Sequence, residues 1–212
     1  MNQLLPAILV QDEAAFRERI KLVEGLVPVV HLDVMDGAFV NNRTWFDAKV
    51  LAEVETPLKI ELHLMVKDPT RIIEEVKAIE KVVRAIWHIE TDIDHATLIA
   101  NVHAMKKEVG LAISPKTPVD QLARYAPQLD EILVMGGEPG FGGQRHEPHT
   151  IEKAWDIHGR WPEIALGFDI NVNAETIATL KAAGISRFCA GSAVFASGNV
   201  KEDVQNLQSL IE

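Results

Sequence analysis

The sequence contains a single cysteine, Cys189, among its 212 residues. No intrachain disulfide can form, and a reducing, cytoplasmic setting is expected. No apolar run reaches the roughly 18 residues that a membrane helix needs, so no membrane partner is expected. The first residues lack a basic segment and lead into Asp12 and Glu13, which indicates that they are not a signal peptide.

Basic residues are also scarce, with 21 Lys and Arg against 31 Asp and Glu and a formal net charge of −10. This balance argues against a nucleic-acid partner, because the basic footprint of such proteins is missing. A small anionic substrate stays compatible, since backbone N–H groups and helix N-termini can hold a phosphate. Apolar residues make up 47 % of the chain, enough for one sizeable core, and we expect residues 1–212 to form a single domain.

Short β-type runs alternate with stretches of helical spacing along the whole chain. Helical spacing is clear at Phe16, Ile20 and Val23, and a loop with one short helix is expected near Asp47–Val54. The alternation predicts parallel strands, either in a doubly wound open sheet or in a (β/α)₈ barrel. Eight runs spaced about 25 residues apart, with no GxGxxG after the first run, favour the barrel. The runs are Leu4–Leu9, Val29–Val34, Leu58–Val66, Ala85–Ile89, Gly110–Ile113, Glu131–Met135, Ile164–Phe168 and Arg187–Ala190.

The second run places polar side chains on one face of its strand. His31, Asp33 and Met35 share that face, while the intervening valines and leucine suit the helix layer. The polar set is therefore expected to point into the barrel, where a buried His and carboxylate need a partner. A metal ion is one such partner, and a plain His–Asp hydrogen bond is the other.

Two further strands add to this set. His63 and Met65 share a face of the third run, and Asp169 ends the seventh. Active sites of such barrels lie at the carboxyl ends of the strands. Two imidazoles and two carboxylates there suit one divalent cation, and Zn²⁺, Fe²⁺, Mn²⁺ and Co²⁺ all remain open.

Other strand ends carry candidate substrate contacts. Met35, Met65 and Met135 suggest a soft apolar wall over a planar bound intermediate, although methionine commonly fills core gaps. Gly-rich segments follow the sixth and eighth runs, and each is either an ordinary turn or an anion-binding loop. A His88–Glu90 pair shares an inward face and suits a supporting role, while the five remaining histidines are expected to be solvent-exposed. The glycine-rich segments contain Gly140, Phe141, Gly142, Gly143, Gly191 and Ser192.

These motifs together resemble the ribulose-phosphate 3-epimerase family, which includes allulose-6-phosphate 3-epimerase. The matching segments run in order over nearly the whole chain. They are HLDVMDG (31–37), ELHLMV (61–66), the His88–Glu90 pair, PKTP (115–118), PGFGGQ (139–144) and AGSAVF (190–195).

The resemblance implies a (β/α)₈ barrel with one divalent metal, held by His31, Asp33, His63 and Asp169. It also implies that Asp33 and Asp169 are the acid/base residues on opposite faces of the substrate. By the same resemblance, the three methionines line the intermediate, and Gly140 to Gly143 with Gly191 and Ser192 grip the phosphate. One Asp would remove the C3 proton to form a metal-stabilised enediolate, and the other would return a proton to the opposite face.

Several positions depart from the family pattern. Ala7 stands where the family has serine, and Ala38 where it has histidine. Glu138 adds negative charge near the expected mouth. The turn after the seventh run reads Ile170-Asn171 in place of two glycines, and a positive φ there would strain Ile170. The departures spare the metal and proton-transfer residues and affect the parts that hold substrate.

The leading hypothesis is an isomerase, a metal-dependent 3-epimerase that interconverts D-ribulose 5-phosphate and D-xylulose 5-phosphate. The alternatives are the same chemistry on another ketose phosphate, such as D-allulose 6-phosphate, or a non-catalytic barrel that binds metal and ligand. The partner is expected to be a small sugar phosphate. A homo-oligomer stays open, because no interface can be read from the sequence.

Overall fold

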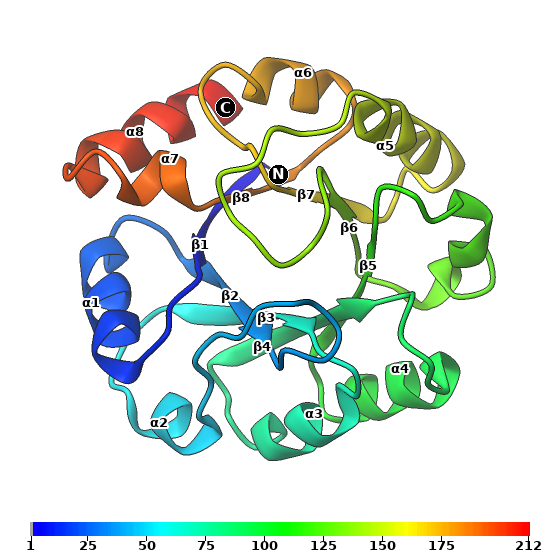
Figure 1. Cartoon of the computed structure of the whole chain (residues 1–212), viewed down its shortest axis with the longest axis horizontal. Helices are drawn as coiled ribbons and strands as arrows, with labels where there is room; N and C mark the ends of the chain where they lie inside the picture. Colours follow the sequence, from blue (N-terminus) through cyan, green and yellow to red (C-terminus); the bar gives the residue numbers. More distant parts are fainter. Residues whose placement is uncertain (1) are drawn as a thin grey trace.

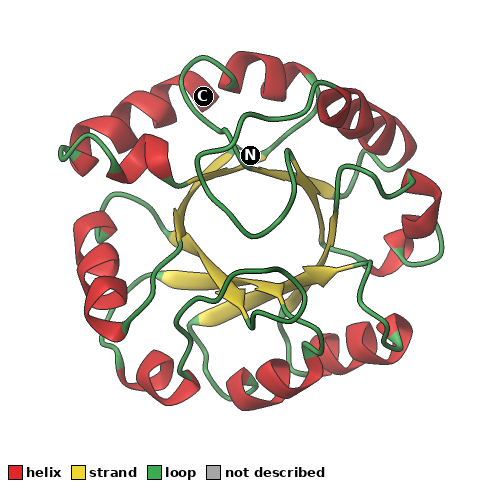
Figure 2. Cartoon of the chain, in the orientation of Figure 1, coloured by secondary structure: helices red, strands yellow, loops and turns green. Residues whose placement is uncertain are grey.

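The computed structural model describes residues 2–212 and contains eight parallel strands closed into a barrel. Each strand pairs with the next in the chain, and β8 pairs with β1, so the predicted fold is confirmed. Figures 1 and 2 look along the barrel, with a ring of strands inside a ring of helices. The strands are β1 (Gln3–Ile8), β2 (Val29–Met35), β3 (Lys59–Met65), β4 (Val82–His88), β5 (Glu108–Ile113), β6 (Glu131–Met135), β7 (Ala165–Asp169) and β8 (Arg187–Ala190).

Helices join the strands on the outside of the barrel. The short helix expected after β2 is α2, and the Asp47 side chain caps it by accepting hydrogen bonds from the amides of Lys49 and Val50. In the part of the chain that the structure describes, no helix has the length and apolar character to cross a membrane. The α-helices are α1 (Glu13–Val23), α2 (Ala48–Glu53), α3 (Thr70–Val76), α4 (His95–Ala104), α5 (His149–Arg160), α6 (Ile177–Ala182), α7 (Ser192–Phe195) and α8 (Val200–Ile211).

The connection from β5 to β6 differs from the others. It contains two 3₁₀ helices, η1 (Val119–Leu122) and η2 (Ala126–Gln128), and no α-helix. Pro118 precedes η1 and Pro127 lies within η2. Proline disfavours helical backbone in the residue before it and removes a backbone donor, so these two positions break a continuous α-helix.

The alternation of side chains along β2 separates two environments. Val30, Leu32 and Val34 belong to the large core between the sheet and the helices. His31 and Asp33 point the other way, into the barrel, and both are buried. The outward face supplies the apolar burial that holds the helix layer in place, which frees the inward face for polar groups.

A charged layer fills the barrel below the mouth. Arg84 of β4 forms ion pairs with Glu61 of β3, Glu108 of β5 and Glu131 of β6, and Arg187 of β8 also pairs with Glu131. Glu61 and Glu131 have no solvent exposure. Paired charges are tolerated there because each carboxylate faces a guanidinium, whereas an unpaired buried charge would be very costly.

Two segments cross the mouth of the barrel at the carboxyl ends of the strands. One follows β2 and the other follows β6, as Figure 1 shows in blue and yellow-green. The side-chain amide of Asn42 in the first segment donates to the carbonyl oxygen of Gly140 in the second, at 2.7 Å. Trp45 stacks on Phe16 with ring centroids 4.6 Å apart, so it packs against the helix layer.

One expectation about surface histidines is wrong. His95 begins α4 and is only 6 % exposed, because its ring packs beside Trp87. The indole Nε1–H of Trp87 donates to His95 Nδ1 at 3.0 Å. The sequence analysis expected this histidine to be exposed because it lies in a helical stretch. Its partner Trp87, however, lies on the preceding strand and helps to bury it.

Candidate active site

Four polar residues from three strands converge inside the mouth of the barrel. His31 and Asp33 lie on β2, His63 on β3 and Asp169 at the end of β7. The register of β2 against β3 sets Asp33 beside His63. One ligand atom from each residue lies within 4.8 Å of the corresponding atoms of the others. The structure therefore brings together the four residues that the sequence analysis grouped.

The closest contacts centre on one nitrogen of His63. Its Nδ1 lies 2.9 Å from Asp33 Oδ1, 3.2 Å from His31 Nε2 and 3.9 Å from Asp169 Oδ2. His31 Nε2 is also 3.3 Å from Asp33 Oδ1. Two imidazole nitrogens and two carboxylate oxygens thus surround a single point, which is the donor set of a divalent transition-metal site.

The other nitrogen of each imidazole has its own partner. His31 Nδ1 lies 2.5 Å from Glu61 Oε1, and His63 Nε2 lies 3.0 Å from His88 Nε2. His88 Nδ1 in turn lies 3.1 Å from Glu90 Oε2. If each of these outer nitrogens carries the hydrogen, His31 Nε2 and His63 Nδ1 keep free lone pairs. This chain of donors orients both rings as metal-ligating histidines are usually oriented.

The two carboxylates experience opposite electrostatic effects. Burial acts to raise the pKa of Asp33, but its close contacts with His31 and His63 hold that pKa well below its usual range. The pKa of Asp169 is raised, first by burial and then by the negative charge of Asp33. Paired carboxylates with divergent pKa values are a common arrangement for proton transfer.

A second group of possible ligands lies deeper, at His31, Glu61 and Cys189. Cys189 Sγ is 3.4 Å from His31 Nδ1. Burial raises the pKa of the Cys189 thiol, which disfavours the thiolate form that binds metals. The same His31 nitrogen is already engaged by Glu61, and the group with Asp33 and Asp169 is therefore the better metal site.

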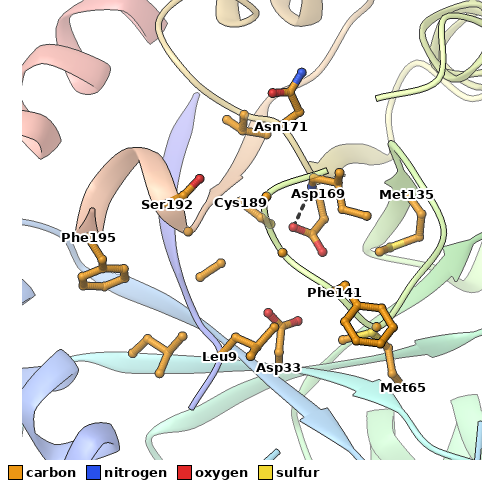
Figure 3. Close-up of a pocket in the computed structure, with 18 of the residues that line it drawn as sticks. Leu9, Asp33, Met65, Met135, Phe141, Asp169, Asn171, Cys189, Ser192 and Phe195 are labelled. Atoms are coloured by element: carbon orange, nitrogen blue, oxygen red, sulfur yellow. Dashed lines mark hydrogen bonds between the residues drawn. The ribbon is translucent and has the colours of Figure 1, made fainter. Parts of the chain in front are cut away.

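A cavity of about 440 Å³ opens above the four residues. Asp33 and Asp169 reach into it from opposite sides, with Met65 and Met135 along one wall, as Figure 3 shows. His31 and His63 have no solvent exposure and lie behind the two carboxylates. All nine residues predicted to contact substrate line this cavity: Met35, Met65, Met135, Gly140, Phe141, Gly142, Gly143, Gly191 and Ser192.

The turn after β7 has positive φ values, the conformation that was expected to strain Ile170. Ile170 has φ of 80° and Asn171 has φ of 59°. Ile170 is a β-branched residue in the left-handed region, so this turn stores strain. Its N–H donates to Asp169 Oδ1 at 2.8 Å, and the Asn171 side chain contacts His146 Nδ1 at 2.9 Å. The turn keeps the φ values natural to glycine although neither residue is glycine.

The other departures from the family pattern fall in different places. Ala7 lines the cavity and presents a methyl group where a serine hydroxyl would stand. Ala38 and Glu138 are outside the cavity lining. Glu138 is exposed and forms an ion pair with Lys116, so its negative charge is matched outside the mouth.

Sequence reasoning missed three residues at this site. Glu61 shares the inward face of β3 with His63, so the period of two along the strand could have marked it as a partner of His31. Arg19 and Phe195 line the cavity from α1 and α7. Helix residues that reach the mouth leave no periodic signal, because their position depends on how each helix packs on the barrel.

A closed parallel barrel with polar groups gathered at the carboxyl ends of its strands defines an enzyme of the (β/α)₈-barrel class. The chain belongs to the ribulose-phosphate 3-epimerase family, whose model, described as "Ribulose-phosphate 3 epimerase family", matches residues 3–195. This membership makes it an isomerase of the carbohydrate-epimerase type.

Relatives in bacteria and fungi are similar over almost their full lengths. The ribulose-phosphate 3-epimerase of Escherichia coli K12 is 33 % identical over 220 residues, covering 99 % of this chain and 96 % of that protein. The protein of the same name from Chlamydia trachomatis is 33 % identical over 215 residues, covering 96 % and 91 %. That from Schizosaccharomyces pombe is 29 % identical over 214 residues, covering 99 % and 93 %.

Solved structures similar to this chain share its fold at low sequence identity. Orotidine 5'-monophosphate decarboxylase from Sulfolobus solfataricus has a TM-score of 0.70 at 10 % identity, covering 100 % of this chain and 98 % of that one. A tryptophan synthase α-subunit from Pyrococcus furiosus has a TM-score of 0.74 at 12 % identity, covering 99 % and 100 %. At such identities the likeness concerns the barrel alone.

Proposed function

We propose that the protein is a metal-dependent 3-epimerase that interconverts D-ribulose 5-phosphate and D-xylulose 5-phosphate. The observation that carries this proposal is the pair Asp33 and Asp169, which face each other across the cavity (Figure 3). Inverting a carbon centre by proton transfer needs one group on each side of the reacting carbon. Family membership supports the substrate, since the curated relatives are named for it.

His31, Asp33, His63 and Asp169 would hold one divalent cation. The geometry supports this, because their ligand atoms cluster within 4.8 Å and the outer imidazole nitrogens have partners of their own. A bound cation would stabilise negative charge on the substrate's C2 and C3 oxygens. The donor set suits Zn²⁺, Fe²⁺, Mn²⁺ or Co²⁺.

The two aspartates would act as acid and base in turn. One carboxylate oxygen takes the proton from C3 and leaves an enediolate, and the opposite carboxyl group returns a proton to the other face. The reverse reaction exchanges their roles. Met35, Met65 and Met135 exclude water with a polarizable apolar wall, which protects the planar intermediate from unwanted protonation.

The phosphate would lie at the part of the cavity lined by Gly142, Gly143, Gly191 and Ser192. Glycines let the backbone approach an anion closely, and backbone N–H groups are suitable donors to phosphate oxygens. This grip leaves the C2–C3 end of the sugar near the aspartates.

The proposal is tested by isotope exchange. Metal-loaded protein is incubated with D-ribulose 5-phosphate in D₂O, and ¹H NMR follows deuterium entry at C3 and formation of D-xylulose 5-phosphate. We expect both. D-allulose 6-phosphate is tested in parallel, because Ala7 and Ile170 change the cavity wall relative to the family. A higher kcat/KM for that sugar would replace the proposed substrate but keep the chemistry.

Single changes test the acid/base assignment. Asp33→Asn and Asp169→Asn should each lower kcat by about 10³-fold or more, because each removes one proton-transfer group. Asp92→Asn is the matched control, since Asp92 is exposed and outside the cavity lining. If metal-loaded protein exchanges no ketose phosphate, the protein is a non-catalytic barrel. If either variant keeps most of its activity, the assignment of roles is wrong.

A further inference from the structure

The cavity above the aspartates has one cationic side chain in its lining. Arg19 of α1 lies there together with the anionic Asp33 and Asp169, and no other charged residue lines the cavity within residues 2–212. Phe195 of α7 lines the same cavity, and Figure 3 places it with Ser192 away from the methionine wall. The cavity therefore has an acidic centre and a separate cationic contribution.

The guanidinium of Arg19 rests on an aromatic ring. Its Cζ lies 4.4 Å from the centroid of the Phe195 ring. Such stacking holds the guanidinium plane by cation–π attraction while its N–H groups at the edge stay available. Arg19 is half-buried, so part of its hydration is already displaced before a ligand arrives.

Arg19 has no carboxylate partner among the described residues, unlike its neighbour on the same helix. Arg17 donates to Glu13 at 2.7 Å, one turn away on α1. Arg84 and Arg187 are likewise paired with carboxylates inside the barrel. An arginine that lines a cavity, stacks on an aromatic ring and lacks a counter-ion is suited to bind an anion.

We propose that Arg19 binds the phosphate group of the substrate through its guanidinium and so sets the preference for phosphorylated over unphosphorylated ketoses. The inference rests on the proposed function, because it assumes that a sugar phosphate enters this cavity. A phosphate dianion would otherwise meet a chain of net charge −10 and a cavity with two aspartates. Arg19 supplies the only side-chain charge of the right sign in the described lining.

This role explains how the cavity can bind the phosphate group although the turn after β7 contains no glycine. Ile170 puts an apolar side chain, 8 % exposed, into the cavity wall at that turn. A charged side chain from α1 can add affinity without relying on that turn. Guanidinium groups bind phosphate in a two-pronged geometry that also orients the ligand.

The first experiment compares Arg19→Met with wild type in the metal-loaded enzyme. Methionine removes the charge and keeps an apolar stem against Phe195. We expect KM for D-ribulose 5-phosphate to rise by about 10- to 100-fold, the effect of losing hydrogen bonds to a charged group. The KM of Arg19→Lys should lie between those of wild type and Arg19→Met. Arg17→Met is the matched control on the same helix and should stay within about twofold of wild type.

The second experiment separates phosphate binding from catalysis. Isothermal titration of metal-free protein with inorganic phosphate should give a dissociation constant at least about tenfold weaker for Arg19→Met than for wild type. Deuterium exchange into unphosphorylated D-ribulose should be the same in both. If Arg19 only supported the local packing around Phe195, its loss would lower exchange into unphosphorylated D-ribulose as much as it weakens phosphate binding.

The outcomes distinguish this inference from the proposed function. If wild type epimerises D-ribulose 5-phosphate but Arg19→Met binds substrate and phosphate equally well, the inference is wrong and the function stands. If wild type processes no ketose phosphate yet loses phosphate affinity in Arg19→Met, the function is wrong and the anion site stands. A variant that does not fold is replaced by Arg19→Gln, to which the same criteria apply.

Discussion

His31 and Glu61 face each other inside the barrel, with Nδ1 of the imidazole 2.5 Å from Oε1 of the carboxylate. Adjacent strands create this contact, because the parallel register sets His31 of β2 beside Glu61 of β3. Glu61 also pairs with Arg84, which fixes the carboxylate from below. The charged layer thus connects to the candidate metal site through one side chain, and Glu61 determines which nitrogen of His31 faces the site.

Glu61→Gln should weaken binding of a divalent cation by about 10- to 100-fold, the usual effect of changing a residue that orients a metal-bound histidine. Competition with a fluorescent chelator measures the affinity. Glu131→Gln is the control, because Glu131 also contacts Arg84 but does not contact His31. Equal affinities in wild type and Glu61→Gln would show that His31 needs no such partner.

Removal of metal should stop epimerisation without unfolding the barrel. The apolar core between sheet and helices is extensive and does not include the four candidate ligands, so its packing does not depend on a cation. We expect chelator-treated protein to keep its far-ultraviolet circular dichroism and to regain activity with Zn²⁺, Fe²⁺, Mn²⁺ or Co²⁺. Full turnover by protein verified as metal-free would refute the proposed dependence.

At position 170, glycine should give a more stable protein than alanine, which reverses the usual order of these two substitutions. Both substitutions remove the buried side chain, but only glycine also removes the strain at φ of 80°. The left-handed conformation costs an L-residue about 1–2 kcal/mol, so Ile170→Gly should be more stable than Ile170→Ala by about 1 kcal/mol. Urea unfolding at pH 7 measures the difference.

Val172 provides the control for this comparison. It is buried, lies two residues further on, and is not among the residues with positive φ. Alanine should there be the more stable replacement by about 0.5–1 kcal/mol. The same ranking at both positions would mean that the turn at Ile170 is not strained.

Glu131 should give the protein a pH-dependent stability. Burial, and then the negative charge of Glu61, raise the pKa of Glu131 from 4.5 to about 7. Between these values the folded state holds a proton that the unfolded state has lost, so this contribution to stability falls as the pH rises and is gone above about pH 7. Across the full window the shift corresponds to about 3 kcal/mol.

Urea unfolding of wild type and Glu131→Gln from pH 5 to pH 8 tests this expectation. The free energy of unfolding of wild type should fall relative to that of the variant as the pH rises, because glutamine does not titrate. Glu55→Gln, an exposed position, should run parallel to wild type. A constant difference between wild type and Glu131→Gln would mean that Glu131 stays ionised throughout.

The fold and the centre of the site could be predicted from the sequence because both depend on local periodicity. Alternation along β2 and β3 separates inward His31, Asp33 and His63 from outward apolar residues, and this follows from strand geometry alone. A short helix was also expected near Asp47–Val54, whereas its cap by the Asp47 side chain came from the structure. From the sequence we could say only that a positive φ at Ile170 would be strained. That φ is in fact positive came from the structure.

What only the tertiary structure decided are contacts between elements distant in sequence. Burial of His95 depends on Trp87 across a strand–helix boundary, and the pairing of Glu61 with Arg84 depends on register inside a closed barrel. Arg19 lines the cavity from α1, and its side chain stacks on Phe195 of α7, which lies far from it in the sequence. Periodicity gives the face of an element, but the partner on that face is set by long-range packing, which no local pattern encodes.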